Sequence, residues 1–360
     1  MEPFTLDQRM DVEFFDFERL KALVAELFEL SGLDSPDAAV AASVLVEADL
    51  TGVWSHGVAR VPMYRERLRR GAAKARPNIE IAHVTPCVAR VDGDDGLGLV
   101  VAPRAMAKAI DLALANGIGL VGVRRSGHFG ASAYYLRQAT ARGCIALSFT
   151  TASPAIAPWG AAQPFFGTSP FGFSAPTTDD RTFLIDMAMS KVARGKLKFA
   201  AQRGDSIAEG YAVNAQGTPT TDGKDAFYGA MLPFGEHKGA ALSWMMDVLA
   251  GVFTGAAFGG EAGNPFEDLE RPQGTGHVFI AMPCDLFLPK EEFAQRMAAL
   301  DRRVKSLPLA PGVERIFAPG EPEAVRAEVN RKRGVPLTRD VVANLQAEAK
   351  RSNVAWPFDG

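Results

Sequence analysis

The sequence predicts an α/β protein with helical segments at both ends of the chain. Its 360 residues are 47% apolar and 22% charged, which is typical of a folded protein with a large buried core. Helical and extended patterns alternate through the middle of the chain, and this alternation indicates an α/β architecture. The helical segments at the two ends are expected to pack together as one discontinuous unit around that middle part.

Each expected element follows from its apolar periodicity and from the residues that bound it. In the N-terminal part we expect helices over 17–30 and 35–50, the second with Ser35 as its N-cap. A third helix is expected over 55–71, with Ser55 as its N-cap. Further along, the expected strands and extended pieces are 87–92, 99–101, 117–123, 182–187 and 276–282, together with a strand that begins at Cys144. The expected helices are 102–116, 238–253, 291–305, 321–333 and 338–351, together with one that follows a turn over 126–130 and ends at Arg142.

The charge and cysteine content exclude several classes of function. The net charge of −3 lacks the basic surplus that a nucleic-acid partner requires. Three dispersed cysteines with no CxxC spacing argue against a metal site or a disulfide framework and favour a reducing, cytoplasmic setting. The uncharged run 143–178 contains five prolines, so we do not expect it to span a membrane, and the acidic start of the chain does not resemble a signal peptide.

One glycine motif is interpreted as a decoy. The run from Gly117 to Gly122 matches GxGxxG, the pattern of Rossmann dinucleotide sites. Those sites need a strand, the glycine turn and then a helix, whereas here the motif ends a helix and enters a strand. We therefore interpret Gly117 as a helix cap.

Two other places suit an anionic ligand. The small-residue turn at 126–130 lies between a strand and a helix, where free backbone N–H groups and the helix dipole attract anions. His237 and Lys238 stand at the start of another expected helix, and Asp186 ends an expected strand. Each of these features also fits a structural role, and His83 and His277, in apolar surroundings, are interpreted as structural.

His56, Arg60 and Tyr64 are spaced at i, i+4 and i+8, so on one helix they would share a face. An imidazole transfers protons near neutral pH, and a guanidinium binds a carboxylate through two parallel hydrogen bonds. Tyr64 either extends this polar wall or packs in the core. We further hypothesise that the helix N-terminus lowers the pKa of His56.

Four short segments, taken in order, resemble one known family. They are Ser55-His56-Gly57 with Arg60, Gly127-His128-Phe129-Gly130, Gly167-Thr168-Ser169-Pro170 followed by Asp186-Met187-Ala188, and His237-Lys238-Gly239. Together they resemble the malate/L-lactate dehydrogenase family, whose fold is of the non-Rossmann, sulfolactate-dehydrogenase-like type. Relatives include ureidoglycolate dehydrogenase, diketogulonate reductase and the Δ1-piperideine-2-carboxylate/Δ1-pyrroline-2-carboxylate reductases, and the resemblance covers about 17–354.

The resemblance implies an NAD(P)-dependent oxidoreductase that forms a homodimer. It implies a helical substrate and dimerisation domain over 1–120 and 306–360, and an NAD(P)-binding α/β domain over 121–305. His56 would be the proton donor and acceptor, with Ser55 as its partner. The expected substrate-binding residues are Arg60, Tyr64, Thr168, Arg194 and Gly195, and the expected cofactor-binding residues are His128, Phe129, Gly130, Ala131, Ser132, Asp186, Met187, Ala188, His237, Lys238, Arg315, Gly320 and Glu321.

The expected reaction moves a hydride between nicotinamide and C2 of a small 2-oxo or cyclic 2-imino acid. The segment PFGEHKG looks closest to the cyclic imino acid reductases, although Glu236 replaces a glycine. The alternatives are a malate- or L-lactate-type 2-hydroxyacid dehydrogenase and, more remotely, a non-catalytic ligand-binding protein on the same scaffold. The cofactor is NAD or NADP, with NADPH favoured for imine reduction. Trp54 and Ser169 depart from the family pattern, which usually has an acidic residue and an asparagine there.

Overall fold

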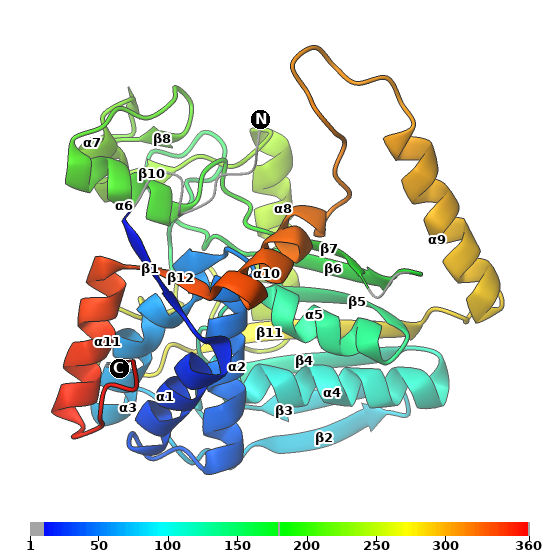
Figure 1. Ribbon diagram of the computed structural model, residues 1–360, viewed down its shortest axis with the longest axis horizontal. Helices are drawn as coiled ribbons and strands as arrows, with labels where there is room; N and C mark the ends of the chain where they lie inside the picture. The colour runs from blue at the N-terminus through cyan, green and yellow to red at the C-terminus, as the bar shows by residue number, and fades with distance from the viewer. Residues whose placement is uncertain (1–10, 179–180, 359–360) are drawn as a thin grey trace.

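A seven-stranded mixed sheet forms the centre of the computed structural model, which describes residues 11–178 and 181–358 (Figure 1). The strand order is β2-β3-β4-β11-β5-β6-β7, and only the β3–β4 pair is parallel. The strands are β2 (Glu80–Thr85), β3 (Val88–Asp92), β4 (Gly119–Ser126), β5 (Cys144–Thr150), β6 (Phe171–Pro176), β7 (Thr182–Met187) and β11 (Thr275–Pro283).

Helices cover both faces of this sheet because its central strand is apolar on both sides. Along β11, Phe279 and Ala281 join the main core, whereas Val278 and Ile280 pack on the opposite face. Helices α4 (Gly98–Asn116) and α5 (Ser132–Ala141) lie against the first face, and α8 (His237–Asp247) with the π-helical η4 (Val248–Val252) lies behind the sheet in Figure 1.

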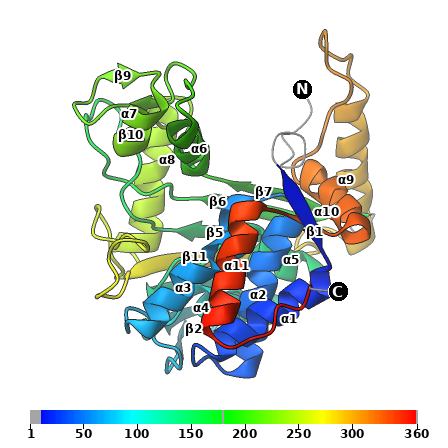
Figure 2. The same ribbon diagram turned by 60° about the vertical axis from the view of Figure 1, so that its left-hand side comes forward.

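The two ends of the chain pack together, as the sequence predicts. Helix α2 (Ser35–Leu50) contacts α10 (Glu321–Arg333), and α3 (Val61–Arg69) contacts α11 (Arg339–Arg351), so N- and C-terminal helices lie side by side in Figure 2. Helix α1 (Phe17–Glu29) packs on α2, and β1 (Val12–Phe15) pairs with β12 (Val335–Thr338). The expected division into two domains stays a prediction. The central sheet draws β2 and β3 from residues that we placed in the helical unit.

Two smaller parts extend from this body. One contains α6 (Arg194–Arg203), α7 (Gly223–Tyr228) and the short strands β8 (Ala212–Val213), β9 (Pro219–Thr220) and β10 (Ala230–Met231), around a core of its own. The other is α9 (Lys290–Lys305), which has no buried residue and stands away from the sheet in Figure 1. No helix among the described residues is both long and apolar enough to cross a membrane.

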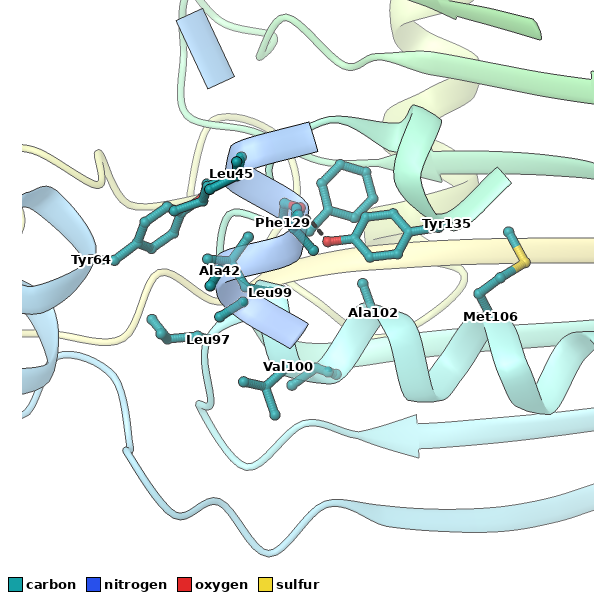
Figure 3. Packing of buried hydrophobic residues seen from close by; sticks show 14 of the residues in the cluster. Ala42, Leu45, Tyr64, Leu97, Leu99, Val100, Ala102, Met106, Phe129 and Tyr135 are labelled. Carbon is teal, nitrogen blue, oxygen red and sulfur yellow. Dashed lines mark hydrogen bonds between the residues drawn. The ribbon is translucent and has the colours of Figure 1, made fainter. Parts of the chain in front are cut away.

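The main core holds the chain next to His128 in place. Figure 3 shows Tyr64 of α3 beside Leu45 of α2, and the ring of Phe129 beside that of Tyr135. The Tyr135 hydroxyl donates a hydrogen bond to the carbonyl of Phe129. Tyr64, Phe129 and Tyr135 are almost fully buried, so the backbone around position 128 is fixed by packing.

Several local predictions need correction. Residues 99–101 are helical, because α4 already begins at Gly98, and the N-cap of α2 is Asp34, one residue before Ser35. His83 is exposed on β2 with Lys108 beside it, rather than surrounded by apolar residues. Gly117 does end α4, with φ of 85°, and a side chain at Gly119 would overlap the backbone of α4. The GxGxxG match is therefore a helix cap and a close helix–strand contact.

Candidate active site

The segment that carries His56 forms two short 3-10 turns, η2 (Trp54–His56) and η3 (Val58–Arg60), before α3 begins. The prediction of one helix with His56, Arg60 and Tyr64 on a shared face is therefore wrong. Pro62 explains the difference, because proline is accommodated in the first turn of a helix but not deep inside one. Helix α3 thus begins at Val61, and Ser55 does not cap it.

The turns nevertheless gather the expected side chains into what we call the histidine cluster, namely Ser55, His56, Arg60, Tyr64 and His128. Ser55 Oγ lies 2.9 Å from His56 Nδ1, and Arg60 Nε donates to the Ser55 carbonyl at 2.7 Å. The rings of His56 and His128 stack with centroids 5.5 Å apart and planes at 19°. Tyr64 combines both of its expected roles, because its buried ring packs in the core while its hydroxyl lies 2.6 Å from His128 Nδ1.

Two side chains that sequence reasoning missed support the cluster. Gln273, in the loop before β11, accepts a hydrogen bond from the backbone N–H of His128 at 2.8 Å. Phe266, in the same loop, lies under the Arg60 guanidinium at 4.8 Å from the ring centroid. Both residues lie more than 130 positions from the segments that they support, so no local sequence pattern marks them.

Burial keeps the cluster uncharged apart from Arg60. Desolvation, with a smaller contribution from Arg60, lowers the pKa of His56 to about 3. The direction matches our hypothesis, but burial is the main cause and no helix begins at His56. Desolvation likewise lowers the pKa of His128 and raises that of Tyr64. The protonated Tyr64 hydroxyl therefore donates to His128 Nδ1, which leaves the proton of the neutral imidazole on Nε2.

The first turn of α6 borders the cluster. A side chain at Gly195 would contact both Ser55 and Trp54 at 3.7 Å, and the Trp54 ring packs edge-on against Phe199 at 5.1 Å. Arg194 is exposed and lies 5.5 Å from the Phe227 ring centroid. The structure thus brings Arg194 and Gly195 next to the His56 turn, and Trp54 contributes an aromatic wall at this border.

The N-terminus of α5 already holds a carboxylate of the protein itself, and the expectation that this end contacts a cofactor stays a prediction. Asp186, at the end of β7, accepts a hydrogen bond from the backbone N–H of Ala133 at 2.9 Å, and the backbone of Ser132 also donates to it. A carboxylate from a distant strand thus occupies this helix end. Burial raises the pKa of Asp186 to about 6.

The N-terminus of α8 is different, because among the described residues neither its N-cap residue Glu236 nor a side chain from elsewhere accepts a hydrogen bond from its first turn, although the Lys238 N–H donates to the Gly235 carbonyl at 3.1 Å. Gly235 and Glu236 both have positive φ, and His237 and Lys238 are exposed in the first turn. Backbone contacts bring other expected segments to this loop: the Met189 N–H donates to the Thr168 carbonyl at 2.9 Å, and the Phe234 N–H donates to the Met189 carbonyl at 2.9 Å. The segments that contain Thr168, Asp186-Met187-Ala188 and His237-Lys238 therefore converge.

Arg315, Gly320 and Glu321 lie elsewhere. Glu321 forms ion pairs with Arg315 and with Lys305 of α9, and Gly320 packs on Leu184 of β7. Gly320 and Glu321 line a cavity of about 340 Å³ between β7 and α9, with Phe317 and Lys305 also in its wall. In the described residues no contact joins these three positions to the histidine cluster.

Comparison with known proteins decides the family. The model of the malate/L-lactate dehydrogenase family matches residues 15–346. The chain is 37% identical to a malate dehydrogenase of Pyrococcus horikoshii, over 94% of this chain and 95% of the relative. It is 33% identical to the NAD(+) ureidoglycolate dehydrogenase of Escherichia coli K12, over 92% and 95%.

The chain belongs to the malate/L-lactate dehydrogenase family. Solved structures agree: the P. horikoshii malate dehydrogenase superposes with a TM-score of 0.89 at 34% identity, covering 98% of this chain and 99% of the other. Δ1-piperideine-2-carboxylate reductase from Pseudomonas syringae superposes with a TM-score of 0.84 at 29% identity, covering 94% and 100%. These matches confirm the resemblance, the sulfolactate-dehydrogenase-like fold and an NAD(P)-dependent dehydrogenase.

The residues of this dehydrogenase fit a dinucleotide at the segment that leads into α8, Phe234 to Lys238, which we call the α8 loop. The uncapped helix end and Lys238 suit a pyrophosphate, which carries negative charge. Ser190 forms a bridge with Pro233 beside this loop, and its buried hydroxyl has no partner in the described part of the chain. An orphaned hydroxyl next to an open helix N-terminus is what a polar cofactor would satisfy.

Proposed function

We propose that this dehydrogenase interconverts a small 2-oxo acid and the corresponding 2-hydroxy acid, with NAD or NADP as cofactor. The geometry of the histidine cluster carries the proposal: a proton-transfer group, His56, and a carboxylate-binding group, Arg60, lie on adjacent turns and both contact Ser55. A 2-oxo acid needs these two groups side by side because its carboxylate adjoins the reacting carbon. When bound, the cofactor carries the hydride that C2 gains or loses.

The residues of the chain handle the proton and the orientation of the substrate. With Ser55 Oγ accepting from Nδ1–H, His56 Nε2 is the atom that takes the hydroxyl proton or returns it to the carbonyl oxygen. Arg60 holds the substrate carboxylate and so determines which face of C2 meets the hydride. A bound carboxylate also offsets the Arg60 charge, one of the two causes of the low pKa of His56, and so favours the imidazolium that donates in the reductive direction.

The remaining expected residues complete this proposal. His128, with its proton on Nε2, offers a hydrogen-bond donor beside the reacting atoms. Residues Phe129 to Ser132, Asp186 to Ala188, His237 and Lys238 would hold the cofactor, and Thr168, Arg194 and Gly195 would border the substrate. Arg315, Gly320 and Glu321 are proposed to contact a more distant part of the cofactor.

A cyclic 2-imino acid is a second candidate substrate. The structural likeness to the P. syringae Δ1-piperideine-2-carboxylate reductase and the PFGEHKG segment favour it. The aromatic pair Trp54–Phe199 beside the His56 turn also suits an apolar ring better than a second carboxylate.

One panel of assays tests both candidates. Oxidation of NADH and NADPH is followed with pyruvate, oxaloacetate, larger 2-oxo acids, Δ1-piperideine-2-carboxylate and Δ1-pyrroline-2-carboxylate. We expect turnover of 2-oxo acids with at least one cofactor. Turnover of the cyclic imines well above the ketones would move the assignment to an imino acid reductase. Cofactor binding without turnover of any compound would overturn both and favour a non-catalytic binding protein.

We also propose that the protein forms a homodimer. Trp244, Val248 and Val252 are spaced by one turn on α8 and η4, and each is about half exposed, at 59%, 49% and 54%. A row of exposed apolar side chains is typical of a protein interface, and a second copy of the chain would cover it. Light scattering is expected to give the mass of two chains for the wild type and the mass of one chain for Val248→Glu.

A further inference from the structure

The two turns of the candidate site meet at the peptide bond between Gly57 and Val58. The Gly57 carbonyl accepts the hydrogen bond of the Arg60 N–H at 3.0 Å, which closes the second turn. The Val58 N–H on the same peptide points to α2, where Asp49 Oδ2 accepts it at 2.7 Å. This one peptide unit is therefore held at both of its polar ends, between the residue that carries the proton and the residue that binds the carboxylate.

Asp49 and Gly57 also fit each other sterically. A Cβ atom built on Gly57 would overlap the Asp49 carboxylate. The backbone of Gly57 is extended with a negative φ, −89°, and so lies outside the left-handed region that favours glycine. Glycine is therefore required here for the close approach of the carboxylate and not for an unusual backbone conformation.

Asp49 lies in a tightly packed part of α2, near the C-terminal end of that helix. Asp49 is only 3% exposed, and its neighbours Ala48 and Leu50 are buried. The Leu50 carbonyl accepts a hydrogen bond from Asn330 of α10 at 2.8 Å, and Thr51 bonds back to Glu47 at 2.9 Å within α2. Burial raises the pKa of Asp49 to about 8, so the carboxyl group is mostly protonated near neutral pH. Asparagine then reproduces both its shape and its charge state.

We propose that Asp49 is a positioning residue, which sets the relative placement of His56 and Arg60 through the Gly57–Val58 peptide. The inference rests on the proposed function of those two side chains. Asp49 itself touches neither of them through a hydrogen bond, and it acts through the turn. Small displacements of paired catalytic groups strongly lower the rate of turnover, since a misplacement of about 1 Å can reduce it by about 100-fold.

The test compares three substitutions in the full-length protein. Asp49→Ala removes the acceptor, Asp49→Asn keeps it, and Thr51→Val is the matched control, because Thr51 is a buried polar residue at the same helix end that bonds only within α2. Asp49→Ala is expected to lower kcat and to raise KM for the 2-oxo acid, each by roughly tenfold, with the Kd of NADH unchanged. Asp49→Asn is expected to restore most of both constants.

Stability separates positioning from a general packing defect. Thr51→Val should lower Tm as Asp49→Ala does, yet leave kcat and KM near the wild-type values. If Asp49→Ala changes the constants no more than Thr51→Val does, or if Asp49→Asn is as impaired as Asp49→Ala, Asp49 has no positioning role. Gly57→Ala should mimic Asp49→Ala, and the double variant Gly57→Ala/Asp49→Ala should be no worse than either single one.

A measurement without substrate keeps this proposal apart from the proposed function. In protein with labelled histidines, the imidazole NMR signals of His56 should shift in Asp49→Ala, remain near their wild-type positions in Asp49→Asn, and leave those of exposed His83 unchanged. These shifts test the positioning of His56 even if none of the assayed acids is turned over. Unchanged His56 signals in Asp49→Ala would overturn the inference.

Discussion

The histidine cluster and the α8 loop (Phe234 to Lys238) differ in almost every physical respect. The cluster is half-buried or buried, its imidazoles are neutral, and its hydrogen bonds are already formed between its own members. In the α8 loop residues 235–238 are exposed, the backbone is strained at Glu236, and no side chain in the described part of the chain caps the helix end. Under the proposed function, the first region places a proton and a small anion, and the second binds a larger anion from solvent.

The comparison with α5 sharpens this contrast. Both α5 and α8 follow a glycine-containing loop, and both were expected to bind an anion. At α5 the anion is part of the protein, the carboxylate of Asp186, whereas at α8 no side chain within the described ranges takes that place. A helix N-terminus is therefore a ligand site only where tertiary structure leaves it open.

The largest expected effect comes from His56→Ala. We expect kcat to fall by about 10²- to 10⁴-fold, because a positioned general acid–base contributes that much. The affinity for NADH, measured by fluorescence titration, should stay unchanged, because the α8 loop is intact. His83→Ala, an exposed histidine beside Lys108, is the matched control. A large loss of NADH affinity in His56→Ala would mean that the two regions are not functionally separate.

Arg60→Lys is expected to act on the same region but mainly on substrate binding. Lysine keeps the charge and loses the fork of parallel donors, including the one that Ser55 accepts. We expect KM for the 2-oxo acid to rise roughly 10- to 100-fold, in line with the loss of a charge-assisted hydrogen bond. Arg104→Lys, in an exposed ion pair with Asp37, serves as the control. An unchanged KM would remove Arg60 from the carboxylate site.

Lys238→Ala tests the other region and should produce the opposite pattern. The Kd of NADH is expected to rise about two- to fivefold, as for the loss of one exposed ion pair, with a smaller change in KM for the acid. Added salt should reduce the difference from the wild type, since exposed charges are screened. Lys332→Ala, at the exposed end of α10, should leave the Kd unchanged. A salt-independent Kd in both proteins would exclude an electrostatic role for Lys238.

Local patterns anticipated the elements whose boundaries depend on local residues. Helix α10 and strand β7 have the expected bounds: Gly320 and Gly334 flank α10, and Arg181 precedes the apolar run of β7. The two turns around His56 were not predicted, although the sequence holds the signal for them. Pro62 restricts where a helix can start and so indicates that α3 begins after Arg60. The four segments that suggested the family lie together in two pairs in the structure. Their spacing along the sequence does not indicate which segment contacts which.

The parts that could not be anticipated depend on contacts between distant residues. The β1–β12 pair joins residues more than 300 positions apart, and the short β12 carries no alternation that announces it. Asp186 resembles a ligand-binding carboxylate in sequence, and only the fold shows that it faces the N-terminus of α5. Asp49 lies in an apolar helix where its burial beneath the His56 turn is likewise a tertiary fact.

The last prediction concerns stability, which should depend on pH through Asp49. Its pKa is raised from 3.8 to about 8 in the folded state, so the folded protein holds a proton that the unfolded chain releases. The stabilisation is complete below pH 3.8, declines as the pH rises through the window up to about 8, and is absent above it. Asp49→Asn does not titrate, so its Tm minus that of the wild type should grow from pH 5 to pH 8 and then level off.

The histidine cluster adds the opposite slope in both proteins, because neutral His56 costs stability as the pH falls from 6.5 towards 3. That contribution cancels in the difference, and a Tm difference that stays constant with pH would show that Asp49 is already ionised in the folded protein.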